Sequence, residues 1–280
     1  MDVIETREQL RDKIEHLKKE NCSVGFVPTM GALHEGHISL IQYCNKNNDI
    51  TVVSIFVNPT QFNERDDYEK YPRDVNKDLK WLEAESCDIV FNPSEKEMYP
   101  EPDKRVFDFG DLDKKLEGYY RPGHFNGVAK VVSKLFDFVK PHRAYFGEKD
   151  LQQLAVVREL AKREQPDLEI VGCPIVREED GLAMSSRNKR LKTEERKNAA
   201  EISNVLFESI NKARAMSLEQ LKNWVLDQLN KNVNINVEYF EIVDEKNFTT
   251  IRNWSDSNSI RGVIAAWVGN VRLIDNIKYE

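Results

Sequence analysis

Two apolar segments with a helical pattern between them constrain the fold of this chain more than any other feature. The run Val24–Val27 predicts a short buried strand, and a helical pattern begins at Gly36. The segment Ile50–Val57 is β-branched and almost wholly apolar, as expected of a strand covered on both faces of a parallel sheet. Strand, helix and strand within about 35 residues form a βαβ unit, whose crossover is nearly always right-handed. We therefore expect an α/β protein organised on a parallel sheet.

The alternation of strands and helices continues along the first part of the chain. A Thr6-x-x-Gln9 capping box predicts a first helix, and Asp74 is expected to cap another. The remaining expected elements are helices at Val128–Val139 and Leu151–Arg163 and strands at Cys87–Phe91, Arg143–Phe146 and Leu168–Val176. These elements predict a five-stranded sheet.

Two stretches of this part lack a periodic pattern. Residues 63–73 have almost no apolar side chains, which indicates a mobile surface loop. Residues 94–122 combine prolines with short apolar pieces, and we expect them to form an irregular excursion folded over the edge of the sheet.

A second, smaller α+β domain is expected in residues 177–280, after a first domain of residues 1–176. Its expected elements are helices at Thr193–Ala213 and Leu218–Leu229 and strands at Val237–Val243, Ile260–Val268 and Val271–Ile274. Because no catalytic cluster is evident there, a lid and dimerisation role is expected.

The composition excludes several classes of protein. Of the 280 residues, 40% are hydrophobic, which is typical of a globular protein with a real core. A net charge of −7 argues against a nucleic-acid carrier, and no apolar run approaches the roughly 18 residues of a membrane span. The four cysteines are isolated, and Met1–Glu5 shows no signal-peptide pattern. We therefore expect a cytoplasmic protein.

The segment from Met30 to His37 holds the strongest local signal of function. His34 and His37 lie between the first predicted strand of the βαβ unit and the N-terminus of its helix. Such a terminus offers unpaired N–H groups and about half a positive charge, which favours a phosphate. Gly36 would allow a ligand to approach the backbone closely. The alternatives are two structural histidines or a metal site, although the scattered cysteines supply no further ligands.

Polar side chains also follow two other predicted strands. Asn58 and Gln61 follow the second strand of the βαβ unit, and Gly147–Asp150 follow a later strand. Gln153 comes directly after, in the first turn of a helix. Ligands of open α/β sheets bind outside the carboxyl ends of strands, where Lys149 could offset charge growing on a phosphate. A plain turn or a solvated charge cluster would explain the same residues.

The segment Asp180–Asn188 has the composition of a loop that folds over a polyphosphate. Ser185 and Ser186 can contact phosphate oxygens, and Arg187 can engage a phosphate with two hydrogen bonds. The pattern is weak by itself, because Ser-Ser-Arg is common in exposed loops.

Together these segments resemble the pantothenate synthetase family, across nearly the whole chain. The matching stretches are Pro28–Gly31, His34–His37, Val53–Phe62, Tyr71–Arg73, Arg121–Phe125, Phe146–Asp150 with Gln152 and Gln153, Met184–Asn188 and Arg272–Asn276.

The resemblance implies a Rossmann-like, parallel-sheet nucleotide-binding domain and a smaller α+β C-terminal domain. It also implies ATP-dependent ligation of (R)-pantoate and β-alanine through a pantoyl adenylate, with release of AMP and pyrophosphate, by a homodimer. It assigns pantoate to Gln61 and Gln153, β-alanine to Gln61, and the proton donor to His37. It assigns ATP binding to Met30, Gly31, Ala32, Leu33, His34, Glu35, Gly36, His37, Gly147, Glu148, Lys149, Asp150, Val176, Met184, Ser185, Ser186 and Arg187.

This chemistry needs positioning and cations rather than a protein nucleophile, because the substrate carboxylate attacks the phosphorus itself. The catalytic candidates are His34, His37, Lys149 and Arg187. Mg²⁺ is expected to be held mainly by the phosphates, because it keeps several waters and often uses few protein ligands, and no residue is assigned as a metal ligand. Two other functions stay open: a related nucleotidyltransferase that transfers AMP to a phosphorylated acceptor, and a non-catalytic nucleotide sensor.

Overall fold

The structure is a computed structural model that describes residues 1–279, and its contacts divide the chain into two units. The first unit comprises Met1–Glu148 and Gln152–Pro174. The second comprises Lys149–Leu151 and the chain from Ile175 onward. The short segment Lys149–Leu151 therefore belongs with the second unit, although its neighbours in the chain belong to the first. The functional division into a substrate domain and a lid stays a prediction.

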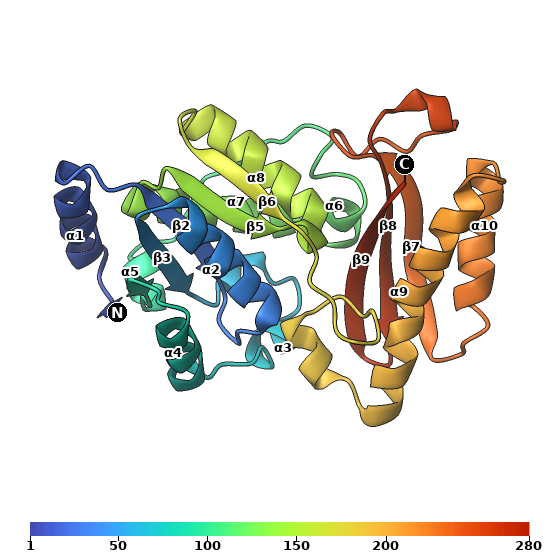
Figure 1. Ribbon diagram of the computed structural model, residues 1–280, viewed down its shortest axis with the longest axis horizontal. Helices are drawn as coiled ribbons and strands as arrows, with labels where there is room; N and C mark the ends of the chain where they lie inside the picture. The colour runs from blue at the N-terminus through green and yellow to red at the C-terminus, as the bar shows by residue number, and fades with distance from the viewer. Residues whose placement is uncertain (280) are drawn as a thin grey trace. The chain divides into compact units, whose positions relative to one another are not determined.

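A six-stranded parallel sheet is the frame of the first unit (Figure 1). Its strands are β1 (Asp2–Ile4), β2 (Val24–Thr29), β3 (Ile50–Ile55), β4 (Ile89–Phe91), β5 (Arg143–Gly147) and β6 (Glu169–Cys173), in the order β1-β4-β3-β2-β5-β6. The order reverses at β2, because β3 and β4 lie on one side of it and β5 and β6 on the other. Ligands of such folds bind at the carboxyl ends of the strands at this switch point, here β2 and β5.

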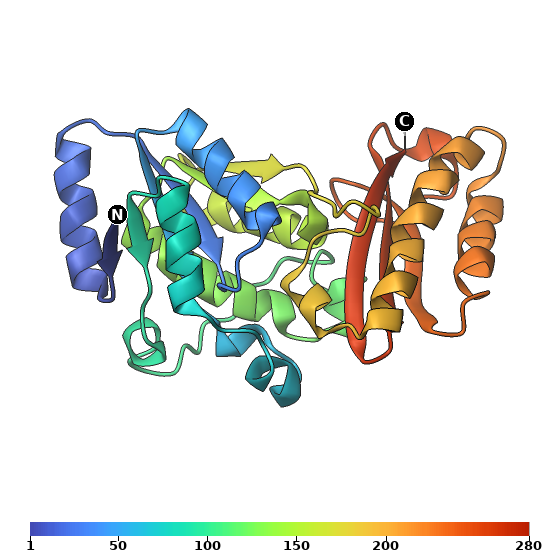
Figure 2. The same cartoon turned by 60° about the horizontal axis from the view of Figure 1, so that its bottom comes forward.

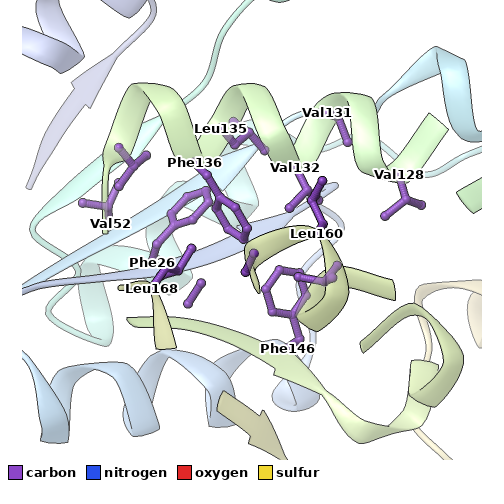
Figure 3. Packing of buried hydrophobic residues seen from close by; sticks show 14 of the residues in the cluster. Phe26, Val52, Val128, Val131, Val132, Leu135, Phe136, Phe146, Leu160 and Leu168 are labelled. Atoms are coloured by element: carbon purple, nitrogen blue, oxygen red, sulfur yellow. The ribbon is translucent and has the colours of Figure 1, made fainter. Parts of the chain in front are cut away.

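Helices cover both faces of this sheet and form a hydrophobic core on each face, which explains why the strands are apolar on both sides. The helices are α1 (Arg7–Lys19), α2 (Glu35–Asn47), α3 (Arg65–Glu69), α4 (Val75–Ala84), α5 (Glu95–Met98), α6 (Glu117–Tyr120), α7 (His124–Val139) and α8 (Leu151–Glu164). Phe26 and Val52 pack with α7 and α8 on one face (Figure 3), where α1 also contributes to the core. Val27 and Val53 pack with α2 and α4 on the other face. Consecutive residues of a strand point to opposite faces, so the predicted parallel sheet with two covered faces is confirmed.

Several element boundaries differ from those expected from sequence. The sheet has a sixth strand, β1, which pairs in parallel with β4 and buries only Ile4. The expected loop at residues 63–73 contains the helix α3, α7 begins four residues before Val128, and β6 ends at Cys173. A strand of three residues is too short to show an alternating apolar pattern in the sequence, so β1 is recognised only by its pairing with β4.

The excursion of residues 94–122 is bonded to the helices α7 and α8, and its position over the sheet edge stays a prediction. The Arg105 guanidinium donates to the Ser133 hydroxyl (2.9 Å) and to the Lys130 carbonyl (3.2 Å) of α7. On α8, the buried amide of Gln152 donates to the carbonyls of Leu112 (2.7 Å) and Lys115 (2.8 Å). Side-chain to backbone bonds of this kind cannot be read from local sequence, because their partners lie 25 to 40 residues apart.

The second unit contains a three-stranded antiparallel sheet in the order β7-β8-β9. Its elements are α9 (Thr193–Ala213), α10 (Leu218–Leu229), β7 (Ile235–Asp244), β8 (Ile260–Val268) and β9 (Val271–Tyr279). Helices α9 and α10 lie side by side against these strands (Figure 2). The strand β9 extends five residues beyond the expected end at Ile274. Among residues 1–279, none of the helices has the length and apolar character needed to cross a membrane.

Candidate functional site

The turn that follows β2 has an unusual backbone. Gly31 and Ala32 both have a positive φ, at 74° and 51°, in the left-handed region that residues with a side chain rarely adopt. The buried carboxylate of Asp78 in α4 holds this turn, because one oxygen accepts from the Ala32 N–H and the other from the Leu33 N–H, each at 2.8 Å. These two charge-assisted bonds offset the conformational cost of the turn.

Asp78 is not among the functional residues predicted from the sequence. The helical spacing could have identified it, because Asp78 precedes Leu82 by four residues and therefore lies on the buried face of its helix. A carboxylate in such a position needs partners, and here they are the amides of the turn that leads to the two histidines.

His34 and His37 lie together at the start of α2, as their spacing predicted. Their ring centroids are 4.1 Å apart, and both side chains are partly exposed. His34 is the N-cap of α2, and its Nδ1 accepts a hydrogen bond from the Gly36 N–H at 3.1 Å. A neutral His34 ring therefore carries its proton on Nε2.

The same contact engages one of the amides at the helix terminus. The Gly36 N–H donates to the His34 ring, and the His37 N–H donates to the His34 carbonyl at 2.8 Å. Both amides are thus engaged within the protein, and both histidine side chains are partly exposed beside them. Phosphate binding by the amides stays a prediction, and it requires the His34 ring to turn away from Gly36.

Gln61 ends the short 3-10 turn Pro59–Gln61 that follows β3, and its side-chain amide has a defined orientation. The Asn58 amide donates to Gln61 Oε1 at 3.0 Å, so Gln61 Nε2 points toward the Met30 sulfur, 3.1 Å away. A thioether is a weak acceptor, and a ligand oxygen in that place would form a stronger bond. Asn58 is itself fixed by the Tyr99 hydroxyl, which donates to Asn58 Oδ1 at 2.8 Å.

A glycine of α7 allows this turn to lie against the helix. A Cβ atom at Gly127 would lie 2.1 Å from the Thr60 carbonyl oxygen, which is far inside van der Waals contact. The Gly127 carbonyl in turn accepts from the Asn58 amide at 3.1 Å. Gly127 therefore supports the position of Gln61.

The carboxyl end of β5 leads into the 3-10 turn Glu148–Asp150. A Cβ atom at Gly147 would meet no protein atom within 4 Å, so packing does not require a glycine there, whereas close approach of a ligand would. The side chain of Lys149 is 17% exposed, and its ammonium lies 3.9 Å from the Asp150 carboxylate. In α8 the two adjacent glutamines differ, because Gln152 is buried and bonded to the excursion while Gln153 is partly exposed.

In the second unit, the residues from Val176 to Arg187 form a compact loop. Arg177 and Ala183 form an antiparallel bridge, and the Met184 N–H donates to the Val176 carbonyl at 3.0 Å. Ser185 then caps the 3-10 helix Ser186–Arg190 by accepting from the Arg187 N–H at 3.3 Å. The loop expected from its Ser-Ser-Arg sequence is therefore ordered by its own hydrogen bonds.

The described residues offer no cluster for a metal ion. Across residues 1–279, no three His, Cys, Asp or Glu side chains lie in an arrangement that could hold one. Burial raises the pKa of the Cys44 and Cys87 thiols to about 12, so both remain protonated near neutral pH and are poor metal ligands.

A doubly covered parallel sheet with histidines and polar turns at its switch point is typical of nucleotide-binding α/β proteins. Comparison with known proteins specifies the family. The family described as pantoate-beta-alanine ligase matches residues 2–278. A pantothenate synthetase of Bacteroides fragilis strain YCH46 is 53% identical over 280 residues, which cover 100% of this chain and 99% of that protein.

Solved structures give the same result. Pantoate-beta-alanine ligase from Thermus thermophilus superposes with a TM-score of 0.94 at 41% identity, with each chain fully covered. The enzyme from Francisella tularensis, complexed with beta-gamma ATP and beta-alanine, gives a TM-score of 0.82 at 37% identity and covers 99% of this chain and 97% of its own. The chain belongs to the pantoate–β-alanine ligase family and is an ATP-dependent ligase.

Proposed function

We propose that this enzyme activates pantoate as an acyl adenylate with ATP, releases pyrophosphate, and transfers the pantoyl group to β-alanine to give pantothenate and AMP. The observation that carries this proposal is that the histidine pair and the Gly147 turn lie at the same end of the sheet, at its switch point. The two histidine rings follow β2, and the Gly147 turn follows its neighbour β5. A free carboxylate does not react with an amine, and activation by ATP supplies the missing leaving group.

His37 is assigned the role of proton donor, by resemblance to the family, and His34 supports it. With Nδ1 of His34 engaged by Gly36, its Nε2–H is a donor that suits a phosphate oxygen. Lys149 and Arg187 are proposed to neutralise charge on the leaving pyrophosphate, an electrostatic contribution that needs no covalent step on the protein. Mg²⁺ is proposed to enter with ATP, held mainly by the phosphates.

Gln61 and Gln153 are proposed to bind pantoate, with Gln61 also close to β-alanine. Pantoate offers hydroxyls and a carboxylate, and an amide can both donate to and accept from them. Gln61 Nε2 faces only the Met30 sulfur in the protein itself, which leaves its donor capacity for a substrate oxygen. Amides also hold the attacking carboxylate less tightly than a cation would.

A homodimer in the cytoplasm is the proposed form of the enzyme. The cytoplasmic location rests on four free cysteines, three of them buried, which suit a reducing compartment. Sedimentation at micromolar concentration tests the dimer, and a monomer there contradicts it.

Exchange of labelled pyrophosphate into ATP tests the adenylate. Exchange is expected with pantoate alone, in the absence of β-alanine. Gln61→Ala is expected to raise the pantoate concentration needed for exchange about ten- to a hundredfold, the scale of one lost hydrogen bond in a closed site, while ATP binding without pantoate is unchanged. Exchange that requires β-alanine contradicts a separate first step, and loss of ATP binding in Gln61→Ala places pantoate elsewhere.

A further inference from the structure

Two consecutive residues of β9, Asp275 and Asn276, have no part in the function described so far. By the alternation of a strand, Asp275 points to the same face as Leu273 and Ile277, which pack in the core of the second unit. Asp275 is a charged residue in this core and is only 5% exposed, and Asn276, on the opposite face of the strand, is only 2% exposed. Burial of such groups is costly unless partners satisfy them, so their partners indicate their role.

The partner of Asp275 is Arg177, at the base of the Val176–Arg187 loop. The guanidinium donates through Nη1 to Asp275 Oδ2 at 2.7 Å and through Nη2 to Oδ1 at 2.9 Å. The same guanidinium donates to the Gly181 carbonyl at 3.0 Å, across the loop. Burial raises the pKa of the Asp275 carboxyl, whereas its hydrogen bonds to Arg177 oppose this shift. The two-pronged contact joins the start of the loop to β9, and the bond to Gly181 ties the turn of the loop to the same guanidinium.

The partner of Asn276 is the segment that carries Lys149. The Asn276 amide Nδ2 donates to the Lys149 carbonyl at 3.3 Å, and its Oδ1 accepts from Arg261 Nη1 at 3.2 Å. The Arg261 contact orients the amide, so that its N–H group faces Lys149. Lys149 also exerts a favourable electrostatic effect on the charged form of Asp275.

We infer that Asp275 and Asn276 are positioning residues, which hold the Lys149 segment and the Val176–Arg187 loop in one fixed arrangement for ATP. This inference rests on the proposed function, in which both segments contact ATP. Neither residue touches a substrate, and each acts through Lys149 or Arg177. A single stretch of β9 thereby links two parts of the ATP site that lie 27 or more residues apart in the chain.

Two nearly isosteric substitutions test the inference in the full-length enzyme. Asn276→Asp removes the donor to the Lys149 carbonyl, and Asp275→Asn replaces one of the two carboxylate oxygens that accept from Arg177. With pyrophosphate–ATP exchange as the assay, each is expected to lower kcat/KM for ATP about tenfold, the scale of one hydrogen bond, while KM for pantoate stays within about twofold. Arg177→Lys tests the Asp275 contact from the other partner, because it keeps the charge and loses the two-pronged geometry, and the same loss of about tenfold is expected.

Glu238→Gln is the matched control. Glu238 of β7 accepts from Arg272 Nε of β9 at 2.9 Å, so this change weakens another ion pair of the same strand. It is expected to lower the thermal midpoint and to leave the exchange kinetics unchanged. Normal exchange kinetics in the Asp275 and Asn276 variants, or an equal kinetic loss in Glu238→Gln, overturns the inference. Absence of pantoate-dependent exchange in the unsubstituted enzyme refutes the proposed function instead.

Discussion

Asp78→Asn is the substitution that most directly tests how the turn before the histidines is held. The Asp78 side chain is 2% exposed, and its two oxygens accept from two consecutive backbone N–H groups. Asparagine has the same shape, but one of its two positions becomes an NH₂ group that faces an N–H donor. One charge-assisted bond is lost outright, and one amide of the turn is left buried without an acceptor.

The expected magnitude follows from these two losses. A hydrogen bond to a charged group contributes about 1.5–3 kcal/mol, so Asp78→Asn is expected to lower the free energy of unfolding by at least about 2 kcal/mol. The turn has Ala32 at a φ of 51°, a conformation that costs about 1–2 kcal/mol and that the remaining contact holds less firmly. Because His34 and His37 follow this turn directly, the exchange rate per folded molecule is expected to fall about tenfold or more. Urea unfolding and pyrophosphate–ATP exchange measure the two effects.

Asp74→Asn provides the matched control on the same helix. Asp74 caps α4 by accepting from the Lys77 N–H at 3.1 Å, and asparagine is an equally good cap, so both measurements are expected to stay near those of the unsubstituted enzyme. The reasoning would be refuted if Asp78→Asn unfolded at the urea concentration of the control, or if its exchange rate were unchanged.

Three further outcomes are expected. His37→Ala should slow adenylation at least about a hundredfold at an unchanged urea midpoint, and normal single-turnover chemistry would return His37 to a structural role. Gly127→Ala should lower stability by about 1–3 kcal/mol and raise KM for pantoate, because its Cβ atom would press on the Thr60 carbonyl; equal KM values for the two proteins would contradict this. The hydrogen bond from Arg105 holds the pKa of Asp103 at about 2, below its ordinary value, so this pair stabilises the fold above about pH 4 and the stabilisation is lost as the pH falls toward 2. In urea titrations between these pH values, the free energy of unfolding of Asp103→Asn should change less with pH than that of the unsubstituted enzyme. An equal change in both proteins would show that the pair does not cause the pH dependence.

Local sequence was sufficient for the elements with a strong period and for the residues that adjoin them. The apolar run around Phe26 and the β-branched run around Val52 predicted the two central strands, because burial on both faces favours apolar residues at nearly every position. The spacing of His34 and His37 placed both rings at the start of α2, and the helical pattern from Leu151 placed Gln153 in its first turn.

The sequence by itself therefore determined the βαβ unit, the covered parallel sheet and the identity of the polar residues that follow its strands. Only the tertiary structure decided that β2 and β5 are neighbours at the switch point, because strand order depends on pairing between segments more than 100 residues apart. It also revealed Asp78 behind the histidine turn and Asn276 behind Lys149, since a buried polar side chain is identified by its partners. Those partners come from distant segments of the chain, so no local sequence pattern predicts them.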